Sequence, residues 1–304
     1  MTDIIIIGAG TAGMTAAIYA QRAGLSSLVL DKGTYGGQVA ITNEIENYPA
    51  FVKITGPELS QNIYKQAKAQ GAEIRFEEVT EAELTGNIKK IKTSVSEYEA
   101  PAVILANGAK RRKLGVPGEE EFAGRGVSYC ATCDGMFFKN KAVAVCGGGN
   151  TALEDALFLS NLCEKVFLIH RREQFTAEAP LISAVQNSKN IDILFSKKVT
   201  AIKGNQTVSS VILSDFQRET AEEYPVSGVF IAIGYEPDNT LFAGQVSLDD
   251  RGYIIASEDC RTNLSGVFAA GDCRTKELRQ IITAAADGAV AAWHAANEIN
   301  LTRR

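Results

Sequence analysis

Two cysteines separated by two residues lie in the segment Ser128–Phe138, which reads SYCATCDGMFF. Such a pair, here Cys130 and Cys133, either contributes half of a zinc site or cycles between a dithiol and a disulfide. Structural zinc needs two further ligands at suitable spacing, but the chain has 2 histidines, His170 and His294, and neither is near another cysteine pair. The residues therefore favour redox chemistry, and we expect no metal site.

Thiol–disulfide exchange needs an attacking thiolate and a proton donor for the leaving sulfur. Asp134 directly follows the pair and is a candidate for that donor, although Asp-Gly is also a strong turn signal. The other cysteines are expected to behave as small buried hydrophobic residues. They are Cys146, Cys163, Cys260 and Cys273.

A glycine-rich loop follows the first strand of the chain. A β-branched run leads into Gly8-x-Gly10-x-x-Gly13 and an alanine-rich helical segment, and a second strand, Ser27–Leu30, ends at Asp31. This context turns the glycine spacing into a dinucleotide fingerprint, in which the pyrophosphate lies at the helix N-terminus. Asp31 is placed to accept hydrogen bonds from a ribose hydroxyl. A glycine turn in a sheet that binds nothing is the alternative.

The same pattern recurs in AVAVCGGGNTALEDALFLS. A strand, AVAV, leads into Gly147-x-Gly149-x-x-Ala152, and the following helix is predicted to begin with a capping box, Thr151-x-x-Glu154. Two dinucleotide loops in one chain suggest two dinucleotides, of which a flavin and a nicotinamide are the natural pair.

The strand after the second loop, VFLIH, ends in His170-Arg171-Arg172 rather than in an acid. An acid would hold a free ribose 2′-hydroxyl, whereas paired arginines suit a 2′-phosphate. The second site is therefore predicted to bind NADP(H), although a solvated strand end would also explain Arg171 and Arg172.

The composition shows no strong charge bias. The chain has 304 residues, which is long enough for two domains. Its net charge of −5, with 22% charged residues, is a poor match to a nucleic-acid binder. The opening MTDIIIIGAG lacks the features of a secretory signal, and no apolar run approaches the ~20 residues of a membrane span. We predict a cytoplasmic protein that binds neither nucleic acid nor membrane.

Taken together, the motifs resemble those of the bacterial-type thioredoxin reductases. The resemblance rests on GAGTAG, GGQ, CATCDG, GGGNTALEDALFLS, HRRE and GVFAAGDCRTKELRQIITAAADG, in the order and spacing of that family. It implies FAD, NADPH, a homodimer, and reduction of the disulfide of thioredoxin or a thioredoxin-like protein.

The resemblance also implies site residues. Those assigned to FAD are Gly8, Gly10, Gly13, Asp31, Gly37, Gln38, Asn47, Asp272, Arg279, Gln280 and Ile281. Those assigned to NADPH are Gly147, Gly149, Asn150, Thr151, Ala152, His170, Arg171 and Arg172. The catalytic residues are Cys130, Cys133 and Asp134.

Two residues depart from the family pattern. Asn107 replaces the usual threonine, for which we expect little consequence. Thr176 replaces the third arginine of the family motif H-R-R-x-x-x-R, which predicts weaker NADPH binding. Asp272 also has an alternative role as a turn residue or helix cap.

The order of the motifs predicts an α/β fold with two Rossmann-like dinucleotide-binding domains, the second inserted into the first. We place the FAD domain at residues 1–114 and 242–304 and the NADPH domain, which carries the cysteine pair, at residues 115–241. One flavin face cannot easily meet both the nicotinamide and the disulfide of the same inserted domain, so that domain is expected to rotate.

In the cycle that the resemblance implies, a hydride passes from nicotinamide to flavin and two electrons pass to the cysteine pair. Cys133 is then the flavin-proximal cysteine, and Cys130 attacks the disulfide of the partner. The alternatives are a ferredoxin-dependent flavin thioredoxin reductase with a vestigial nucleotide site and a non-enzymatic flavin- or zinc-binding scaffold. CATCDG argues against a ferredoxin–NADP reductase, and the early flavin loop argues against a peroxide-system reductase with an additional N-terminal disulfide domain.

Overall fold

The computed structural model describes residues 2–42, 44–215 and 220–303. The chain forms two compact units, the first from Met1–Lys110 and Glu236–Arg304 and the second from Arg111–Tyr235. The segments that connect them, β8 (Ala109–Arg111) and β17 (Tyr235–Pro237), pair as a two-stranded sheet. The division falls at Lys110 and Tyr235, whereas the predicted borders are Leu114 and Leu241. Which nucleotide each unit binds remains a prediction.

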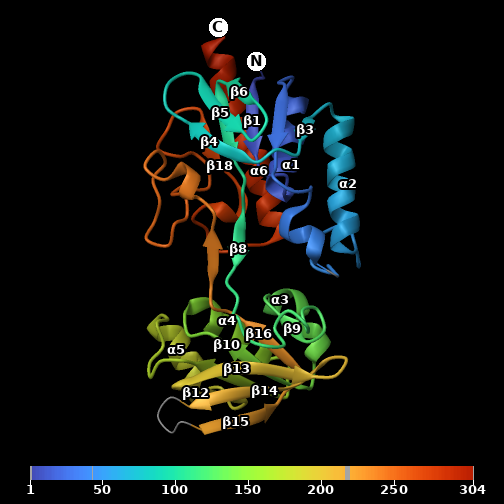
Figure 1. The fold of residues 1–304 in the computed structure, drawn as a ribbon, viewed down its shortest axis with the longest axis vertical. Coiled ribbons are helices and arrows are strands. Elements are labelled where there is room, and N and C mark those ends of the chain that lie inside the picture. The colour runs from blue at the N-terminus through green and yellow to red at the C-terminus, as the bar shows by residue number, and fades with distance from the viewer. Residues whose placement is uncertain (1, 43, 216–219, 304) are drawn as a thin grey trace. The chain divides into compact units, whose positions relative to one another are not determined.

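The first unit is built around a five-stranded parallel sheet with the strand order β18-β7-β1-β2-β3 (Figure 1). Its elements are β1 (Ile4–Ile7), α1 (Thr11–Arg22), β2 (Ser27–Leu30), η1 (Gly37–Ile41), α2 (Gly56–Ala69), β3 (Glu73–Arg75), β4 (Val79–Glu83), β5 (Lys89–Thr93), β6 (Glu97–Ala100), β7 (Ala102–Leu105), η3 (Thr240–Phe242), β18 (Val267–Ala269), η4 (Gly271–Cys273) and α6 (Ile281–Thr302). Strands β1, β2 and β7 are buried on both faces, which explains their continuous apolar sequences.

The two faces of this sheet are covered by different layers. Ile4 and Ile6 pack in a core with α1 and α6, whereas Ile5 and Ile7 pack in a second core with the antiparallel sheet β4-β5-β6. This alternation follows from the two-residue period of a strand. The register places Ile7 level with Leu30 and with Leu105, so these strands end at one edge of the sheet.

The second unit repeats this architecture. Its elements are β9 (Val127–Ser128), α3 (Ala131–Asp134), η2 (Gly135–Phe138), β10 (Ala142–Cys146), α4 (Asn150–Ser160), β11 (Lys165–His170), α5 (Ala179–Gln186), β12 (Ile191–Phe195), β13 (Lys197–Gly204), β14 (Val208–Asp215), β15 (Thr220–Pro225) and β16 (Gly228–Ile231). The parallel sheet has the order β12-β11-β10-β16-β9, and the antiparallel sheet β13-β14-β15 covers one of its faces. The prediction of an α/β fold with two Rossmann-like domains is confirmed.

One local prediction is wrong. Helix α4 begins at Asn150 with Gly149 as its N-cap residue and without a side-chain cap, so Thr151 lies inside the first turn and forms no capping box with Glu154. The glycine loop runs directly into the helix, which leaves the first N–H groups to other partners. Within the described part of the chain, none of the helices combines the length and the apolar character that a membrane span requires.

Candidate active site

The loop after β1 depends on glycine at two positions where backbone segments approach closely. A Cβ atom on Gly8, which has φ +111°, would lie 2.3 Å from the carbonyl oxygen of Ala106. A Cβ atom on Gly13 would lie 1.9 Å from the carbonyl oxygen of Gly8. Neither position accepts a side chain without a backbone shift, so both glycines are required by the protein itself.

Gly10 differs from these two residues because, apart from Gly10 itself and its chain neighbours, no described atom lies within 4 Å of a Cβ atom built on it. It is the N-cap residue of α1, where no described side chain caps the helix and the first turn contains no acidic residue. The helix N-terminus therefore opens onto free space. Unpaired N–H groups and the positive end of the helix dipole fit an anion such as a pyrophosphate there.

Asp31 supports the same loop. Its Oδ2 atom accepts a hydrogen bond from the Ala9 N–H (2.7 Å), and its Oδ1 atom accepts one from the Gly33 N–H (3.0 Å). Each carboxylate oxygen can accept a second hydrogen bond, so Asp31 retains capacity for a ribose hydroxyl.

The segment Gly36–Gln38 lies beside this loop. Gly36 donates its N–H to the Ala9 carbonyl (2.8 Å), and a Cβ atom on Gly37 would lie 3.5 Å from the Cα atom of Gly10. The structure thus brings Gly37 and the following Gln38, which lies in η1, to the N-terminus of α1.

Residues from the C-terminal segment of the first unit contact residues from its N-terminal segment. Asn47 donates its amide to the Gln280 side-chain oxygen (3.1 Å), next to Ile281 at the start of α6. A Cβ atom on Gly271 would lie 2.9 Å from the Cβ atom of Ala12, so the turn that carries Asp272 packs on the first turn of α1.

The guanidinium group of Arg279 lies over the ring of Tyr253, at 4.2 Å from its centre. Its Nε atom is buried and has no hydrogen-bond partner within the described part of the chain. A buried donor of this kind is costly unless a ligand satisfies it. Together with the open helix N-terminus, it fits a bound dinucleotide in the first unit.

The second loop has the same geometry. A Cβ atom on Gly147 would lie 2.4 Å from the Ala232 carbonyl oxygen and 2.6 Å from the Cβ atom of Ala152, which explains the small residue at the end of this fingerprint. Gly149, in contrast, is open: of the described atoms, the Thr176 hydroxyl at 3.9 Å is the one within 4 Å of a Cβ atom built there. This helix N-terminus also fits a pyrophosphate.

His170 lies against the second loop, at the end of β11. A Cβ atom on Gly148 would lie 2.2 Å from the ring Nδ1 atom, and the ring Nε2 atom pairs with the Gln174 carbonyl oxygen (3.0 Å). Burial lowers the pKa of His170, the bond to Gln174 opposes this, and the two neighbouring arginines lower the pKa further. His170 therefore shapes the loop as a neutral ring, which requires glycine at 148, a residue that the fingerprint spacing did not single out.

The remaining residues predicted for the second site surround this loop. Arg171 and Arg172 follow β11 and are exposed. Thr176 donates its N–H (2.8 Å) and its hydroxyl (3.2 Å) to the Gly148 carbonyl. Asn150, the first residue of α4, exchanges two hydrogen bonds with Glu178. Thr151 is exposed at the start of the helix.

Cys130 and Cys133 form a disulfide, and both are half-buried. Ser128, at the end of β9, joins the pair to the neighbouring acid: its hydroxyl donates to Asp134 Oδ2 (2.6 Å) and accepts the Cys130 N–H (3.1 Å). The sequence analysis did not single out Ser128, because a serine before the pair has no distinctive spacing. Asp134 is thus fixed beside the disulfide in the same helical turn.

The other cysteines are free and buried. Burial raises the pKa of the Cys163 thiol to about 11, and burial with the nearby charge of Glu119 raises that of Cys146 to about 12. Burial likewise raises the pKa values of Cys260 and Cys273 to about 12. Since the thiolate is the nucleophile, these four residues are inert at neutral pH.

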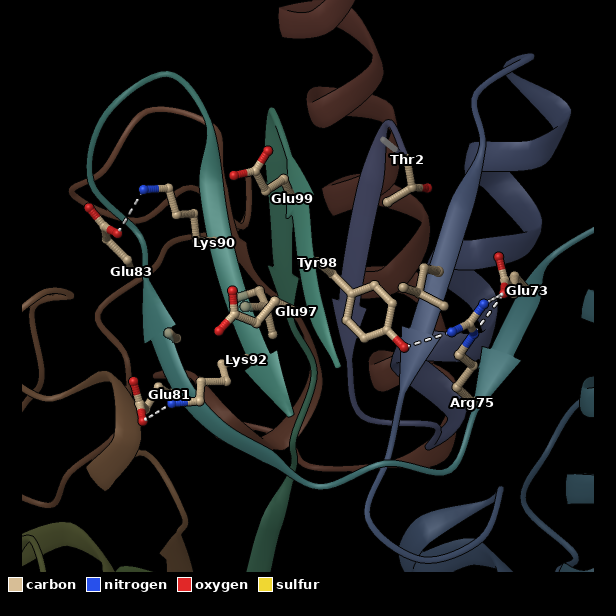
Figure 2. Close-up of a pocket in the computed structure, with 13 residues that line it drawn as sticks. Thr2, Glu73, Arg75, Glu81, Glu83, Lys90, Lys92, Glu97, Tyr98 and Glu99 are labelled. Atoms are coloured by element: carbon tan, nitrogen blue, oxygen red, sulfur yellow. Dashed lines mark hydrogen bonds and ion pairs between the residues drawn. The ribbon is translucent and has the colours of Figure 1, made fainter. Parts of the chain in front are cut away.

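A cavity of about 720 Å³ lies elsewhere on the first unit, between β3 and the antiparallel sheet (Figure 2). Its cationic side chains pair with carboxylates, as in Lys90–Glu83 (3.5 Å) and Lys92–Glu81 (2.8 Å). None of the predicted site residues is among the described residues that line it. We interpret it as a solvated groove with paired surface charges.

Comparison with known proteins places this arrangement in a family. The family model described as pyridine nucleotide-disulphide oxidoreductase matches residues 2–288. A thioredoxin reductase of Bacillus subtilis (strain 168) is 45% identical over 291 residues, which cover 95% of this chain and 92% of that protein.

Solved structures agree with this result. The structure of thioredoxin reductase from Streptococcus pyogenes MGAS5005 is 40% identical and covers 99% of both chains with a TM-score of 0.93. A ferredoxin-flavin thioredoxin reductase from Clostridium acetobutylicum is more distant, at 30% identity and a TM-score of 0.54, with 99% of this chain and 98% of that chain covered. The chain therefore belongs to the pyridine nucleotide-disulphide oxidoreductases and, within them, to the thioredoxin reductases.

Proposed function

We propose that the protein reduces the disulfide of thioredoxin, with FAD held at the first glycine loop and NADPH at the second. The observation that carries this proposal is the repetition of one loop geometry, with an open glycine at the N-terminus of α1 and again at that of α4, in a chain that also holds one disulfide. Two open helix N-termini suit two dinucleotides. The enzyme is thus a flavoprotein thioredoxin-disulfide reductase.

The chemistry that FAD supplies, when bound, is the transfer of two electrons from NADPH to the disulfide. The residues of the first unit bind it: the N–H groups of α1 bind the pyrophosphate, Asp31 binds a ribose hydroxyl, and Arg279 offers its buried Nε donor. In the second unit, Arg171 and Arg172 bind the 2′-phosphate of NADPH.

The cysteine pair carries out the exchange with thioredoxin. The Cys130 thiolate attacks the substrate disulfide, forms a mixed disulfide and releases one substrate sulfur as a thiolate. The Cys133 thiolate then attacks Cys130, restores the internal disulfide and releases the second substrate sulfur. Asp134, oriented by the Ser128 hydroxyl, accepts the Cys133 thiol proton as that thiolate forms and returns it to one leaving substrate sulfur, while water protonates the other. The products are oxidised enzyme and a substrate dithiol.

Anaerobic titration of the yellow protein with NADPH, NADH and reduced ferredoxin tests the electron donor. We expect NADPH to bleach the flavin at lower concentration than NADH does. The ferredoxin alternative is favoured by Thr176, because the family motif has an arginine at this position and the second loop therefore has one cationic ligand fewer. Bleaching by reduced ferredoxin but not by millimolar NADPH would assign the donor to ferredoxin and leave the flavin and cysteine assignments intact.

The variant Thr176→Arg is expected to lower the KM for NADPH by about tenfold and leave that for NADH unchanged. Thr176 is exposed and its backbone N–H is fixed to Gly148, so a longer side chain has room at this edge of the loop. One charge-assisted hydrogen bond to an exposed phosphate contributes ~1.5 kcal/mol, which corresponds to about a factor of ten.

Thr176→Gln is the matched control, since it adds length without charge and should leave both KM values close to those of the parent. Steady-state kinetics with the two nucleotides measure the effect. An equal gain for NADPH and NADH in Thr176→Arg would mean that position 176 does not face the 2′-phosphate.

A homodimer and a cytoplasmic location complete the proposal. Trp293 and Leu278, in and just before α6, are 60% and 55% exposed, and we infer that these apolar side chains contribute to the subunit contact. Sedimentation of the purified protein tests the dimer. Four free thiols suit a reducing compartment, where NADPH-dependent disulfide reduction takes place.

A further inference from the structure

A buried carboxylate in α6 holds the turn that follows β18. Asp287 is 6% exposed, and its Oδ2 atom accepts the backbone N–H of Gly271 (2.9 Å). The same oxygen accepts Arg274 Nε (2.8 Å) and Lys276 Nζ (2.8 Å), and Oδ1 accepts Arg274 Nη2 (2.8 Å). One carboxylate thus links two cations and a backbone N–H.

Arg274 is itself fixed. It is 1% exposed, and its Nη1 atom donates to the carbonyl oxygens of Ala256 (3.2 Å) and Thr275 (2.9 Å). Burial alone raises the pKa of Asp287, but the bonds from Arg274 and Lys276 outweigh it and leave the pKa below its ordinary value. Asp287 is therefore charged at neutral pH. An ion pair buried this deeply is weak evidence of stabilisation, since apolar residues often replace such pairs without loss.

The turn that Asp287 holds is part of the first dinucleotide site. Gly271 has φ +81° and packs on Ala12 in the first turn of α1, so the turn cannot shift toward α1. On its other side, the Gly271 N–H is bound by Asp287. The residue between Gly271 and Cys273 is Asp272, which the family resemblance assigns to FAD.

We propose that Asp287, oriented by Arg274, is a positioning residue for FAD: it fixes the Gly271–Cys273 turn in its binding conformation before the cofactor enters. The inference rests on the proposed FAD site. It predicts that the pair contributes to FAD retention more than to the stability of the FAD-free protein.

Two variants test this role. Asp287→Asn removes the charge that orders the donors around it, and the triple variant Asp287→Leu/Arg274→Met/Lys276→Met replaces the carboxylate and both of its cations with apolar side chains. In both, FAD is expected to leave at least about tenfold faster. The turn loses the charge-assisted hydrogen bond from the Gly271 N–H to Asp287, and one such bond corresponds to about a factor of ten. The unfolding temperature of the FAD-free triple variant should stay close to that of the FAD-free parent. Flavin fluorescence during dilution measures the release of FAD.

Lys276→Met is the matched control, because it removes a cation from the same carboxylate but keeps the bond to Gly271. Its FAD release should stay within threefold of the parent. Release within threefold of the parent in both Asp287 variants would overturn the inference, as would a triple variant whose FAD-free form is destabilised in proportion to its loss of FAD.

Hydrogen exchange on the unmodified full chain tests the same role without a variant that could fail to fold. The Gly271 amide should be protected in the FAD-free protein, and exchange as fast as in exposed loops would overturn the inference. A parent protein that binds FAD but gives these negative results contradicts the role of Asp287 alone. A parent that binds no added FAD contradicts the proposed function itself.

Discussion

Cys133→Ser is expected to lower thioredoxin-dependent turnover by at least about a thousandfold while the protein keeps its FAD. The internal disulfide cannot form without this sulfur, and removal of a nucleophile eliminates the covalent step rather than slowing it. The proposed FAD site lies in the first unit, in the residues around α1 and α6, whereas Cys133 belongs to the second, so the variant has no reason to lose the cofactor. NADPH should still bleach the flavin under anaerobic conditions, because that half-reaction does not involve the cysteines.

Cys130→Ser should abolish turnover to the same extent but differ in its spectrum. It leaves the Cys133 thiol, which we assign to the flavin side of the disulfide, free to perturb the flavin absorbance, whereas Cys133→Ser does not. Turnover is measured by reduction of thioredoxin, and the spectrum by absorbance titration with pH.

Cys163→Ser is the control for the loss of a thiol. Burial raises the pKa of Cys163 to about 11, so it contributes no thiolate at neutral pH and its replacement should leave turnover near that of the parent. Normal turnover in either variant of the Cys130–Cys133 pair would show that this disulfide is not the electron relay.

The elements that carry the two loops are predictable because their signals are local. The sequence predicts Ser27–Leu30 as a strand, and β2 spans the same residues. The β-branched run after Asp3 and the spacing of Gly8, Gly10 and Gly13 likewise indicate β1, the loop and α1. Parallel strands that are buried on both faces have continuous apolar sequences, and glycines mark positions where backbones meet.

The prediction of a capping box at Thr151 is wrong for a local reason. Threonine followed three residues later by glutamate matches the capping pattern, but Gly149 already occupies the N-cap position, two residues earlier. A helix N-terminus built to receive an anion has no need of a side-chain cap. The pattern is therefore misleading where a ligand site replaces the cap.

Contacts between distant residues had no signal in the sequence. Asn47 and Gln280 are 233 residues apart, and they meet because α1 and α6 pack on the same face of the parallel sheet. In the sequence, Asp287 is an ordinary polar residue of a helix, and only the fold brings its carboxylate to the Gly271 N–H. Such contacts depend on strand order and register, which no short motif encodes.

Variants of Gly10 and Gly149, the two open glycines, test most directly which loop binds which nucleotide. Gly10→Ala is expected to weaken FAD binding roughly a hundredfold while the FAD-free protein keeps its stability. Gly10 has φ −75°, which alanine readily adopts, and the added methyl group meets no described atom within 4 Å. The methyl group instead occupies the space through which a pyrophosphate reaches the N–H groups of α1, and one or two charge-assisted hydrogen bonds are lost.

Gly13→Ala is the comparison for a purely structural loss. Its methyl group would lie 1.9 Å from a backbone oxygen, so it should lower the unfolding temperature of the FAD-free protein, which Gly10→Ala should not do. Thermal unfolding of the two FAD-free variants separates loss of binding from loss of folding.

Gly149→Ala makes the equivalent change in the second loop, where φ is −97° and a methyl group would face the Thr176 hydroxyl at 3.9 Å. It should raise the KM for NADPH and leave FAD bound, because the same physical change falls at the other helix N-terminus. Two variants measured against two nucleotides therefore give four results, and the proposed assignment requires that each variant affect one nucleotide. If Gly149→Ala released FAD while Gly10→Ala raised the KM for NADPH, the two sites would be exchanged. If neither variant changed either affinity, the pyrophosphates would not lie at these helix N-termini.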